Sequence, residues 1–150
     1  MLGFIGGTGS EGRGLALRFA LAGERVLIGS RDERRAKAAV KSISRLVPQG
    51  SVRGALNSEV ARDANIVFVT VPYAAHRSSL SSLKEELVGK IVVDVVAPLT
   101  FSKGRARAIP VEEGSVALQA QAVLAESIVV SAFQTTSAQE LLVPERSVDS

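Results

Sequence analysis

A glycine-rich segment near the N-terminus has the spacing of a phosphate-binding loop. Residues 6–12 read Gly-Gly-Thr-Gly-Ser-Glu-Gly and contain the pattern G-x-G-x-x-G at Gly7, Gly9 and Gly12. In such loops the first glycine permits a tight turn, the second leaves room for a pyrophosphate, and the third allows helix and strand to pack closely. The N-terminus of the following helix offers free N–H groups to the phosphates, and Ser10 of this loop is expected to bind the cofactor as well. We therefore expect a dinucleotide here; a glycine-rich turn without a ligand is the alternative.

The residues after the second predicted strand favour NADP over NAD. An acidic residue at this place would accept from the ribose 2′-hydroxyl and would repel a 2′-phosphate. The chain has Gly29-Ser30-Arg31 instead, with Arg34 and Arg35 a helical turn further on. A hydroxyl and a guanidinium suit a phosphate, so Ser30 and Arg31 are expected to bind it. The alternative, a solvated helix face, is the better interpretation for Arg34.

Two further loops follow buried strands, at the sheet edge where ligands of parallel sheets bind. They read Thr-Val-Pro-Tyr-Ala-Ala-His at 70–76 and Val-Val-Ala-Pro-Leu at 95–99. We expect a nicotinamide to be lined by Val71, Pro72, Tyr73, Ala97 and Pro98, although the prolines could simply end the strands. The chain's one histidine, His76, lies in the first loop and is expected to be exposed rather than catalytic.

The segment after the last predicted strand reads Ser-Ala-Phe-Gln-Thr-Thr-Ser-Ala at 131–138. Its small and amide side chains, Ala132 and Gln134 among them, would suit a flat ring laid over the nicotinamide. A plain strand exit would have the same composition.

The elements that position these residues alternate between strand and helix. Short β-rich apolar runs predict strands at Leu2–Ile5, Arg25–Gly29, Val52–Leu56, Ile66–Val71, Ile91–Val96 and Ile128–Phe133. Helical spacing predicts helices at Gly12–Gly23, Glu33–Leu46, Ser58–Asp63, Ser81–Leu87 and Glu112–Ala125. Strands without polar alternation must be covered on both faces. We expect an α/β, doubly wound (Rossmann-type), mostly parallel sheet with helices on both faces, forming a single domain over residues 1–150 with a loose tail from Pro144.

Composition excludes several other classes. The 150 residues are 46% hydrophobic and 22% charged, which is typical of a folded globular protein. With no cysteine and one histidine, disulfide scaffolds, iron–sulfur clusters, thiol nucleophiles and ordinary zinc sites are excluded, so no metal site is expected. An aromatic content of 4% and a net charge of +3 argue against nucleic-acid binding. The longest apolar run is too short for a membrane span, and no signal peptide is recognisable, so a cytoplasmic location is expected.

The motifs taken together resemble the F420-dependent NADP oxidoreductases (NADPH:F420 reductases) in order and spacing. The resemblance rests on Gly6-Gly7-Thr8-Gly9, Gly29-Ser30-Arg31, Val71-Pro72-Tyr73 and Val130-Ser131-Ala132-Phe133-Gln134, followed by Ser137-Ala138. It implies an enzyme that transfers a hydride between NADP(H) and coenzyme F420. It further implies that Thr8, Ser30 and Arg31 hold the 2′-phosphate with help from Arg35, and that residues 132–137 face the deazaflavin ring.

Two departures from the family pattern accompany the resemblance. Gln134 stands where some members carry histidine, which removes an acid–base histidine there. The loss is tolerable because the two cofactors carry the difficult chemistry, so no catalytic side chain is required beyond cofactor positioning. Relatives also continue with strands and helices that complete the F420 pocket and a dimer contact, so the family's C-terminal segment is expected to be absent from this sequence. A naturally short protein and a fragment remain equally open.

Two other functions fit the same residues. One is a non-catalytic NADP(H)-binding module or redox-sensing partner. The other is an NADPH reductase with a different acceptor, such as an imine or a metal ion. The sequence does not show the second ligand, and a homodimer is possible in every case.

Overall fold

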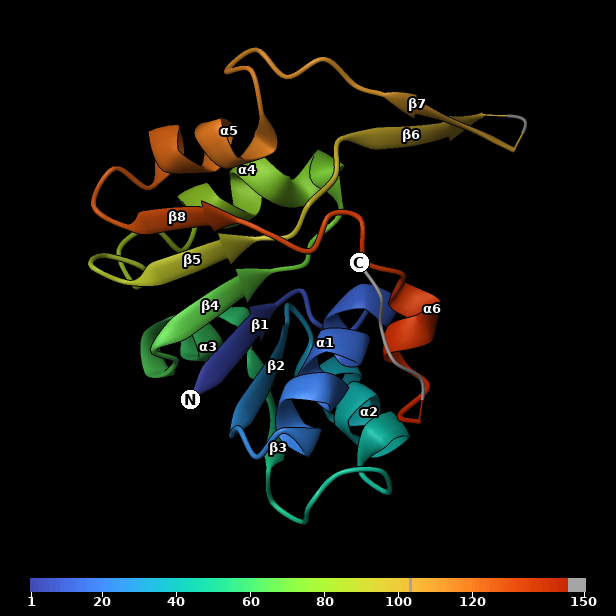
Figure 1. Cartoon of the computed structure of the whole chain (residues 1–150). Helices are drawn as coiled ribbons and strands as arrows, with labels where there is room; N and C mark the ends of the chain where they lie inside the picture. Colours follow the sequence, from blue (N-terminus) through green and yellow to red (C-terminus); the bar gives the residue numbers. More distant parts are fainter. Residues whose placement is uncertain (103, 146–150) are drawn as a thin grey trace.

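The centre of the molecule is a parallel sheet of six strands (Figure 1). The computed structural model describes residues 1–102 and 104–145. The strands of the sheet are β1 Leu2–Ile5, β2 Val26–Ser30, β3 Val52–Leu56, β4 Ile66–Val69, β5 Ile91–Asp94 and β8 Ile128–Ser131. Their order is β3-β2-β1-β4-β5-β8, and every neighbouring pair is parallel. The chain reverses its direction across the sheet between β1 and β4, which is where doubly wound sheets bind ligands.

Helices cover both faces of the sheet, as Figure 1 shows. The described helices are α1 Ser10–Leu21, α2 Glu33–Ile43, α3 Asn57–Asp63, α4 Tyr73–Ser81, α5 Val116–Val123 and α6 Ala138–Leu141. One core cluster joins the sheet to α1, α2 and α6, with Leu15, Ile43 and Leu141 among its members. A second cluster joins the opposite face to α3, α4 and α5, with Val60 and Leu80 among its members. The doubly wound α/β fold is therefore confirmed.

The predicted strands are all present, but three of them end earlier than expected. The ladders of β4, β5 and β8 stop at Val69, Asp94 and Ser131, and the chain then turns into the loops that line the ligand edge. The strand β2 is shifted by one residue and includes Ser30, which brings this side chain into the buried sheet.

All five predicted helices differ from the structure in their bounds. The first lies two residues earlier than expected, the third begins one residue earlier, and the other three differ more. The helix expected at Ser81–Leu87 is wrong: α4 begins directly after Pro72, and residues 82–87 form successive turns. Proline fits the start of a helix because it has no N–H to satisfy and its φ is fixed near the helical value. The helix expected at Glu112–Ala125 is shorter, because Gly114 is left-handed at φ 92° and Ser115 caps α5 by accepting from the Leu118 N–H. The helix expected to Leu46 ends at Ile43.

Three further elements, the two strands of a hairpin and one short helix, were not predicted. An antiparallel hairpin, β6 Leu99–Ser102 and β7 Arg105–Ala108, projects from the body of the molecule (Figure 1). Its second strand is exposed at every residue, so burial imposes no hydrophobic alternation on it. The one-turn helix α6 is capped by the Ser137 hydroxyl, which accepts from the Glu140 N–H. The loose tail expected from Pro144 falls largely on residues 146–150, which lie outside the described residues.

Within residues 1–102 and 104–145, the helices are all too short or too polar to cross a bilayer.

Candidate functional site

The glycine-rich loop leaves β1 by a left-handed turn at Gly6. Gly6 has φ 70°, a conformation that glycine adopts without strain, and the Gly7 N–H donates to the Phe4 carbonyl over 3.2 Å. Asn57, the first residue of α3, accepts from the Gly6 N–H at 3.1 Å and ties the loop to the neighbouring strand connection. The tight turn therefore depends on Gly6. The motif had predicted that Gly7 would permit it, and that prediction is wrong.

The other glycines of the loop differ in what surrounds them. A Cβ atom on Gly12 would lie 2.5 Å from the Gly7 Cα, and one on Gly7 would lie 2.8 Å from the Phe4 Cβ. Neither position has room for a side chain, because helix and strand pack closely around both. A Cβ atom on Gly9 would meet no atom within 4 Å. Gly9 and Ser10 are exposed and Thr8 is half-buried, so the loop presents open backbone at the N-terminus of α1.

The end of β2 places a hydroxyl and a guanidinium beside one another. Ser30 is buried, and its Oγ accepts from the Asp32 N–H at 3.2 Å, which leaves the hydroxyl hydrogen free to donate. Ser30 and the exposed Arg31 both line a pocket of about 300 Å³. Arg35 is exposed but is not part of that lining. The structure thus brings Ser30 and Arg31 together and leaves Arg35 one helical turn away.

Asp32, the acidic residue that follows Ser30 and Arg31, binds the start of α2. Asp32 caps α2 by accepting from the Arg34 N–H at 2.8 Å, and this hydrogen bond holds the pKa of its carboxyl below the ordinary value. Arg34 forms an exposed ion pair with Asp32 at 3.5 Å, so its position on a solvated helix face is confirmed. The carboxylate is thus engaged by the helix start.

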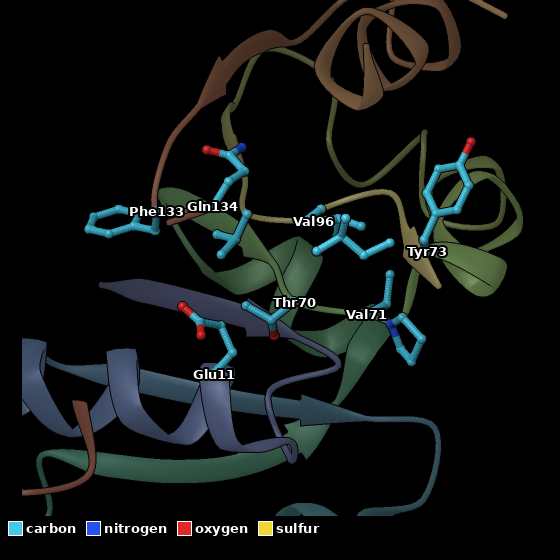
Figure 2. Close-up of a pocket in the computed structure, with 11 residues that line it drawn as sticks. Glu11, Thr70, Val71, Tyr73, Val96, Phe133 and Gln134 are labelled. Carbon is cyan, nitrogen blue, oxygen red and sulfur yellow. The ribbon is translucent and has the colours of Figure 1, made fainter. Parts of the chain in front are cut away.

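A second pocket, of about 350 Å³, lies at the carboxyl ends of β4 and β5 (Figure 2). Figure 2 shows Glu11 on one side of it, Gln134 on the opposite side, and Tyr73 near its mouth. The pocket unites five of the residues predicted to contact the nicotinamide or the ring above it. The lining residues are Glu11, Thr70, Val71, Pro72, Tyr73, Val95, Val96, Ala97, Leu99, Phe133 and Gln134.

Two predicted residues lie outside this pocket. Pro98 lines a neighbouring space of about 320 Å³, which shares Val96 and Gln134 with the first pocket. Ala132 is half-buried and packs against the core cluster on the α1 face. The segment after β8 therefore contributes Phe133 and Gln134, rather than Ala132, to the pocket.

Phe133 has an unusual backbone for a residue with a side chain. Its φ is 69°, in the left-handed region that is unfavourable for most residues with a side chain. Its ring packs 6.1 Å from Phe68 and 6.4 Å from Phe19 between centroids, and these contacts help hold the conformation. The turn that results directs the chain across the end of the sheet and places Gln134 against the pocket.

His76 is not exposed, which corrects the expectation from the sequence. It lies in α4 rather than in a loop and is fully buried between two polar partners. Nε2 lies 2.9 Å from Asp94 Oδ2, and Nδ1 lies 3.1 Å from Gln119 Oε1. This burial could not be predicted from neighbouring residues, because the partners are 18 and 43 residues away along the chain.

The direction of the hydrogen bonds around His76 follows from Glu113, the outermost residue of this buried group. The Gln119 amide nitrogen donates to Glu113 Oε2 at 3.1 Å, and this hydrogen bond lowers the pKa of Glu113, which keeps that carboxylate an acceptor. Gln119 must then present its oxygen to His76, so Nδ1 is the donor. The inner hydrogen bond of the group joins Nε2 to Asp94 Oδ2 at 2.9 Å. Arg77 pairs with Glu113 at the exposed end.

This buried network fixes one wall of the second pocket. Asp94 Oδ1 accepts from the Val96 N–H at 3.1 Å, and the Asp94 carbonyl accepts from Gln134 Nε2 at 2.8 Å. Val96 and Gln134 both line the pocket. The polar residues inside the core thus position the pocket without lining it themselves. A single acid at the end of an apolar strand was the one sequence signal that could have pointed to Asp94.

Glu11 is the one ionisable carboxyl in the lining of the second pocket. Its Oε1 is buried and has no hydrogen-bond partner within the described part of the chain. Burial raises the pKa of this carboxyl. Glu11 occupies a variable position of the glycine motif, so it was not predicted to be a site residue.

The strand order and the glycine loop at the centre of the sheet define a Rossmann-type domain. Residues 1–98 match the model of the family described as NADP oxidoreductase coenzyme F420-dependent. The chain belongs to this family, which confirms the resemblance drawn from the sequence motifs.

Curated relatives and solved structures agree with this assignment. The chain is 40% identical to the F420-dependent NADP reductase of Methanothermobacter marburgensis over 144 residues, which are 92% of this chain and 64% of the relative. It is 40% identical over 139 residues to the F420-dependent NADP reductase of Methanocaldococcus jannaschii, covering 89% of this chain and 62% of the relative. The crystal structure of a proposed F420-dependent NADP reductase from Arthrobacter sp. FB24 superimposes with a TM-score of 0.78 at 32% identity, over 97% of this chain and 67% of that one. The chain thus spans a little under two thirds of the length of these curated relatives.

Proposed function

We propose that this protein is an oxidoreductase that transfers a hydride between NADP(H) and coenzyme F420. The observation that carries the proposal is the placement of two pockets at one edge of the sheet, on either side of an open glycine loop. One pocket offers a hydroxyl and a guanidinium, and the other is largely apolar. A dinucleotide with a 2′-phosphate at one end and a nicotinamide at the other has the complementary chemistry.

The phosphate end is assigned to the loop and to the end of β2. The pyrophosphate would lie on the backbone of Gly7, Gly9, Ser10 and Gly12, where the open space at Gly9 allows close approach. Ser30 and Arg31 would bind the 2′-phosphate by donating to its oxygens, with Thr8 and Arg35 nearby. The engagement of Asp32 by α2 favours NADP because that carboxylate is held away as a cap.

The nicotinamide end is assigned to the second pocket. Val71, Pro72, Tyr73 and Ala97 would contact the ring and keep water from it, and Gln134 would face the deazaflavin above. Pro98 and Ala132 would act from outside that lining, Pro98 in the adjoining space and Ala132 by holding the strand exit.

The bound cofactors would supply the chemistry, since a dihydronicotinamide gives up a hydride and a deazaflavin accepts it together with a proton. The chain's own task is then to hold the two rings in contact and to exclude solvent. The described pocket residues are suited to that task. Gln134 is held by Asp94 and by Ser131 Oγ, each at 2.8 Å, so it has a fixed orientation at the pocket edge.

The test is an anaerobic assay of the 150-residue chain with NADPH and oxidised F420, following the deazaflavin absorbance, with NADPH binding measured in parallel by calorimetry. Bleaching with NADPH, and much slower bleaching with NADH, is the expected result. Binding of NADPH without bleaching would contradict hydride transfer by these 150 residues and would leave two explanations, a non-catalytic binding module or an incomplete enzyme. Reduction of an imine or a metal ion in place of F420 would favour the other acceptors.

Two further expectations remain proposals. The single NADP-binding domain would be a homodimer in solution, which light scattering on the purified chain would test. A cytoplasmic location would be tested by fractionation of the source cells.

A further inference from the structure

Glu11 stands out because the proposed nicotinamide pocket is otherwise built from uncharged side chains. Its carboxyl group comes from the first turn of α1, directly before the glycine that closes the loop. Figure 2 shows the carboxylate turned toward the side of the pocket where Phe133 and Gln134 lie. A buried carboxylate oxygen without a hydrogen-bond donor is unfavourable. A site that keeps one has room for a partner that the chain itself does not supply.

The nature of that partner follows from the charge of the carboxylate. The described lining contains no lysine, arginine or histidine that could neutralise Glu11. The Asp94–His76 pair is already closed on itself through Gln119. A positive charge arriving in the pocket from a ligand would therefore interact with an uncompensated negative charge. In a partly buried site this attraction is stronger than in water.

We propose that Glu11 makes this site prefer the oxidised cofactor, because its carboxylate faces a nicotinamide ring that is cationic in NADP+ and neutral in NADPH. The inference rests on the proposed function and assigns to the same pocket a determinant of redox-state specificity. Tighter binding of NADP+ favours release of hydride from NADPH at this site. Glu11 then shifts the equilibrium between the bound forms of the cofactor without taking part in the hydride transfer.

An alternative role for Glu11 is generic stabilisation of the α1 N-terminus. Acidic residues in the first turn of a helix interact favourably with the helix dipole wherever they occur. Such a role would not distinguish the two forms of the cofactor, since their phosphate groups are identical. The ratio of the two affinities therefore separates the two explanations.

The experiment compares dissociation constants for NADP+ and NADPH by calorimetry in the 150-residue chain and in Glu11→Gln. The substitution keeps the shape of the side chain and removes its charge. A matched control is Glu24→Gln, which removes the same charge at an exposed position after the opposite end of α1. We expect Glu11→Gln to weaken NADP+ relative to NADPH by about fivefold, which corresponds to one charge pair in a partly solvated site. Glu24→Gln should leave the ratio unchanged.

The outcomes are distinguishable. A ratio within twofold of the parent in Glu11→Gln, with binding retained, would overturn the inference and leave the proposed function standing. An equal change in Glu24→Gln would also overturn it, since the effect would then reflect net charge alone. Failure of the parent chain to bind either nucleotide would instead contradict the proposed function. Should Glu11→Gln fold poorly by circular dichroism, Glu11→Asp serves as the second variant, and a reduced preference for NADP+ is expected because the carboxylate is withdrawn by one methylene.

Discussion

The two halves of the sheet build their share of the site by opposite means. In the half formed by β1, β2 and β3, the loop depends on side chains that are missing, since Gly7 and Gly12 have no room for a methyl group and Gly9 leaves open space. In the half formed by β4, β5 and β8, the pocket depends on side chains that are present and buried. Asp94 and His76 hold its wall from within the core.

This difference determines how each half can fail. A backbone site is damaged by adding atoms, because the ligand approaches the main chain directly. A site held by a buried polar network is damaged by removing a partner, because the remaining group stays buried without a hydrogen bond. The first kind of damage should alter binding and leave the fold intact at Gly9. The second should alter folding itself.

The largest effect is expected from Asp94→Ala, which leaves His76 Nε2 buried without a hydrogen-bond partner. Both side chains are fully buried, so the free energy of unfolding should fall by about 3 to 5 kcal/mol. Urea denaturation followed by circular dichroism measures it. Arg77→Ala, at the exposed end of the same network, is the control and should leave the midpoint unchanged. Equal stability of Asp94→Ala and the parent would mean that the network does not support the pocket.

Gly9→Val should act in the opposite way. The added side chain meets no atom of the protein within 4 Å of its Cβ, so the thermal midpoint should remain close to that of the parent. Affinity for NADPH should fall by about 100-fold or more, because the side chain occupies the pyrophosphate position. Gly12→Ala provides the contrast: its Cβ would lie 2.5 Å from the Gly7 Cα, and it should destabilise the fold by about 1 to 3 kcal/mol. Retained NADPH affinity in Gly9→Val would remove the loop from the binding site.

Arg31→Ala tests the specificity of the first half. One charge-assisted contact to a phosphate is worth about 1.5 to 3 kcal/mol, so NADPH affinity should fall by roughly 10- to 100-fold while NADH affinity changes little. Calorimetric titration with both nucleotides measures the difference. Arg34→Ala, which removes the same charge from an arginine with 93% of its side chain exposed, should change both affinities by less than about threefold. Parallel losses for NADPH and NADH in Arg31→Ala would contradict the 2′-phosphate assignment.

Gln134→Ala tests the weaker attachments of the second half. Gln134 is exposed, and its amide donates to the Asp94 carbonyl and to Ser131 Oγ. Removing bonds of this kind should lower stability by about 1 kcal/mol at most and slow hydride transfer more than it weakens NADPH. Stopped-flow reduction of F420 beside an NADPH titration separates the two. Weakened NADPH binding at an unchanged transfer rate would move Gln134 from the deazaflavin side to the nicotinamide side.

The smallest effect concerns the cap of α2. The pKa of Asp32 is lowered by the Arg34 N–H, so its contribution to stability is present above the ordinary value of 3.8 and is lost as the pH falls through the lower, folded value. In Asp32→Asn, the cap persists but this titration disappears, since asparagine is an equally good N-cap. Thermal midpoints recorded from neutral pH down to acid should therefore fall slightly less steeply in the variant. Identical slopes would indicate that the cap is not formed in solution.

The same contrast explains what could be predicted from the sequence. The loop, the strand before it and the helix after it are contiguous, so their pattern predicts the glycine loop, although the turn falls at Gly6 rather than at Gly7. The next strand places Ser30 and Arg31 at its end in the same way. Strand assignments hold because apolar runs such as Ile66–Val69 are buried in the centre of a parallel sheet. The predicted helix boundaries were wrong where one capping residue sets the start of the helix, as Pro72 does for α4 and Ser115 does for α5.

The second half resisted prediction because its contacts are distant in sequence. From its sequence neighbours His76 is expected to be exposed. Its burial depends on Asp94 and Gln119, which the parallel crossovers of the fold bring next to it. In the sequence motif Glu11 is only a variable position. It becomes a pocket residue because Phe133 and Gln134, which are distant in sequence, line the same pocket. The residues next to His76 and Glu11 in sequence therefore do not indicate that these side chains lie in or behind the pocket.

Tyr73 gives the protein an internal optical reporter. It is the chain's single tyrosine, there is no tryptophan, and its ring stands at the mouth of the second pocket (Figure 2). Ultraviolet emission from the chain therefore originates almost entirely at this one ring. A nicotinamide arriving in the pocket should quench that emission, whereas a nucleotide lacking the nicotinamide should leave it largely unchanged, so filling of the nicotinamide half of the site can be observed by itself without any label.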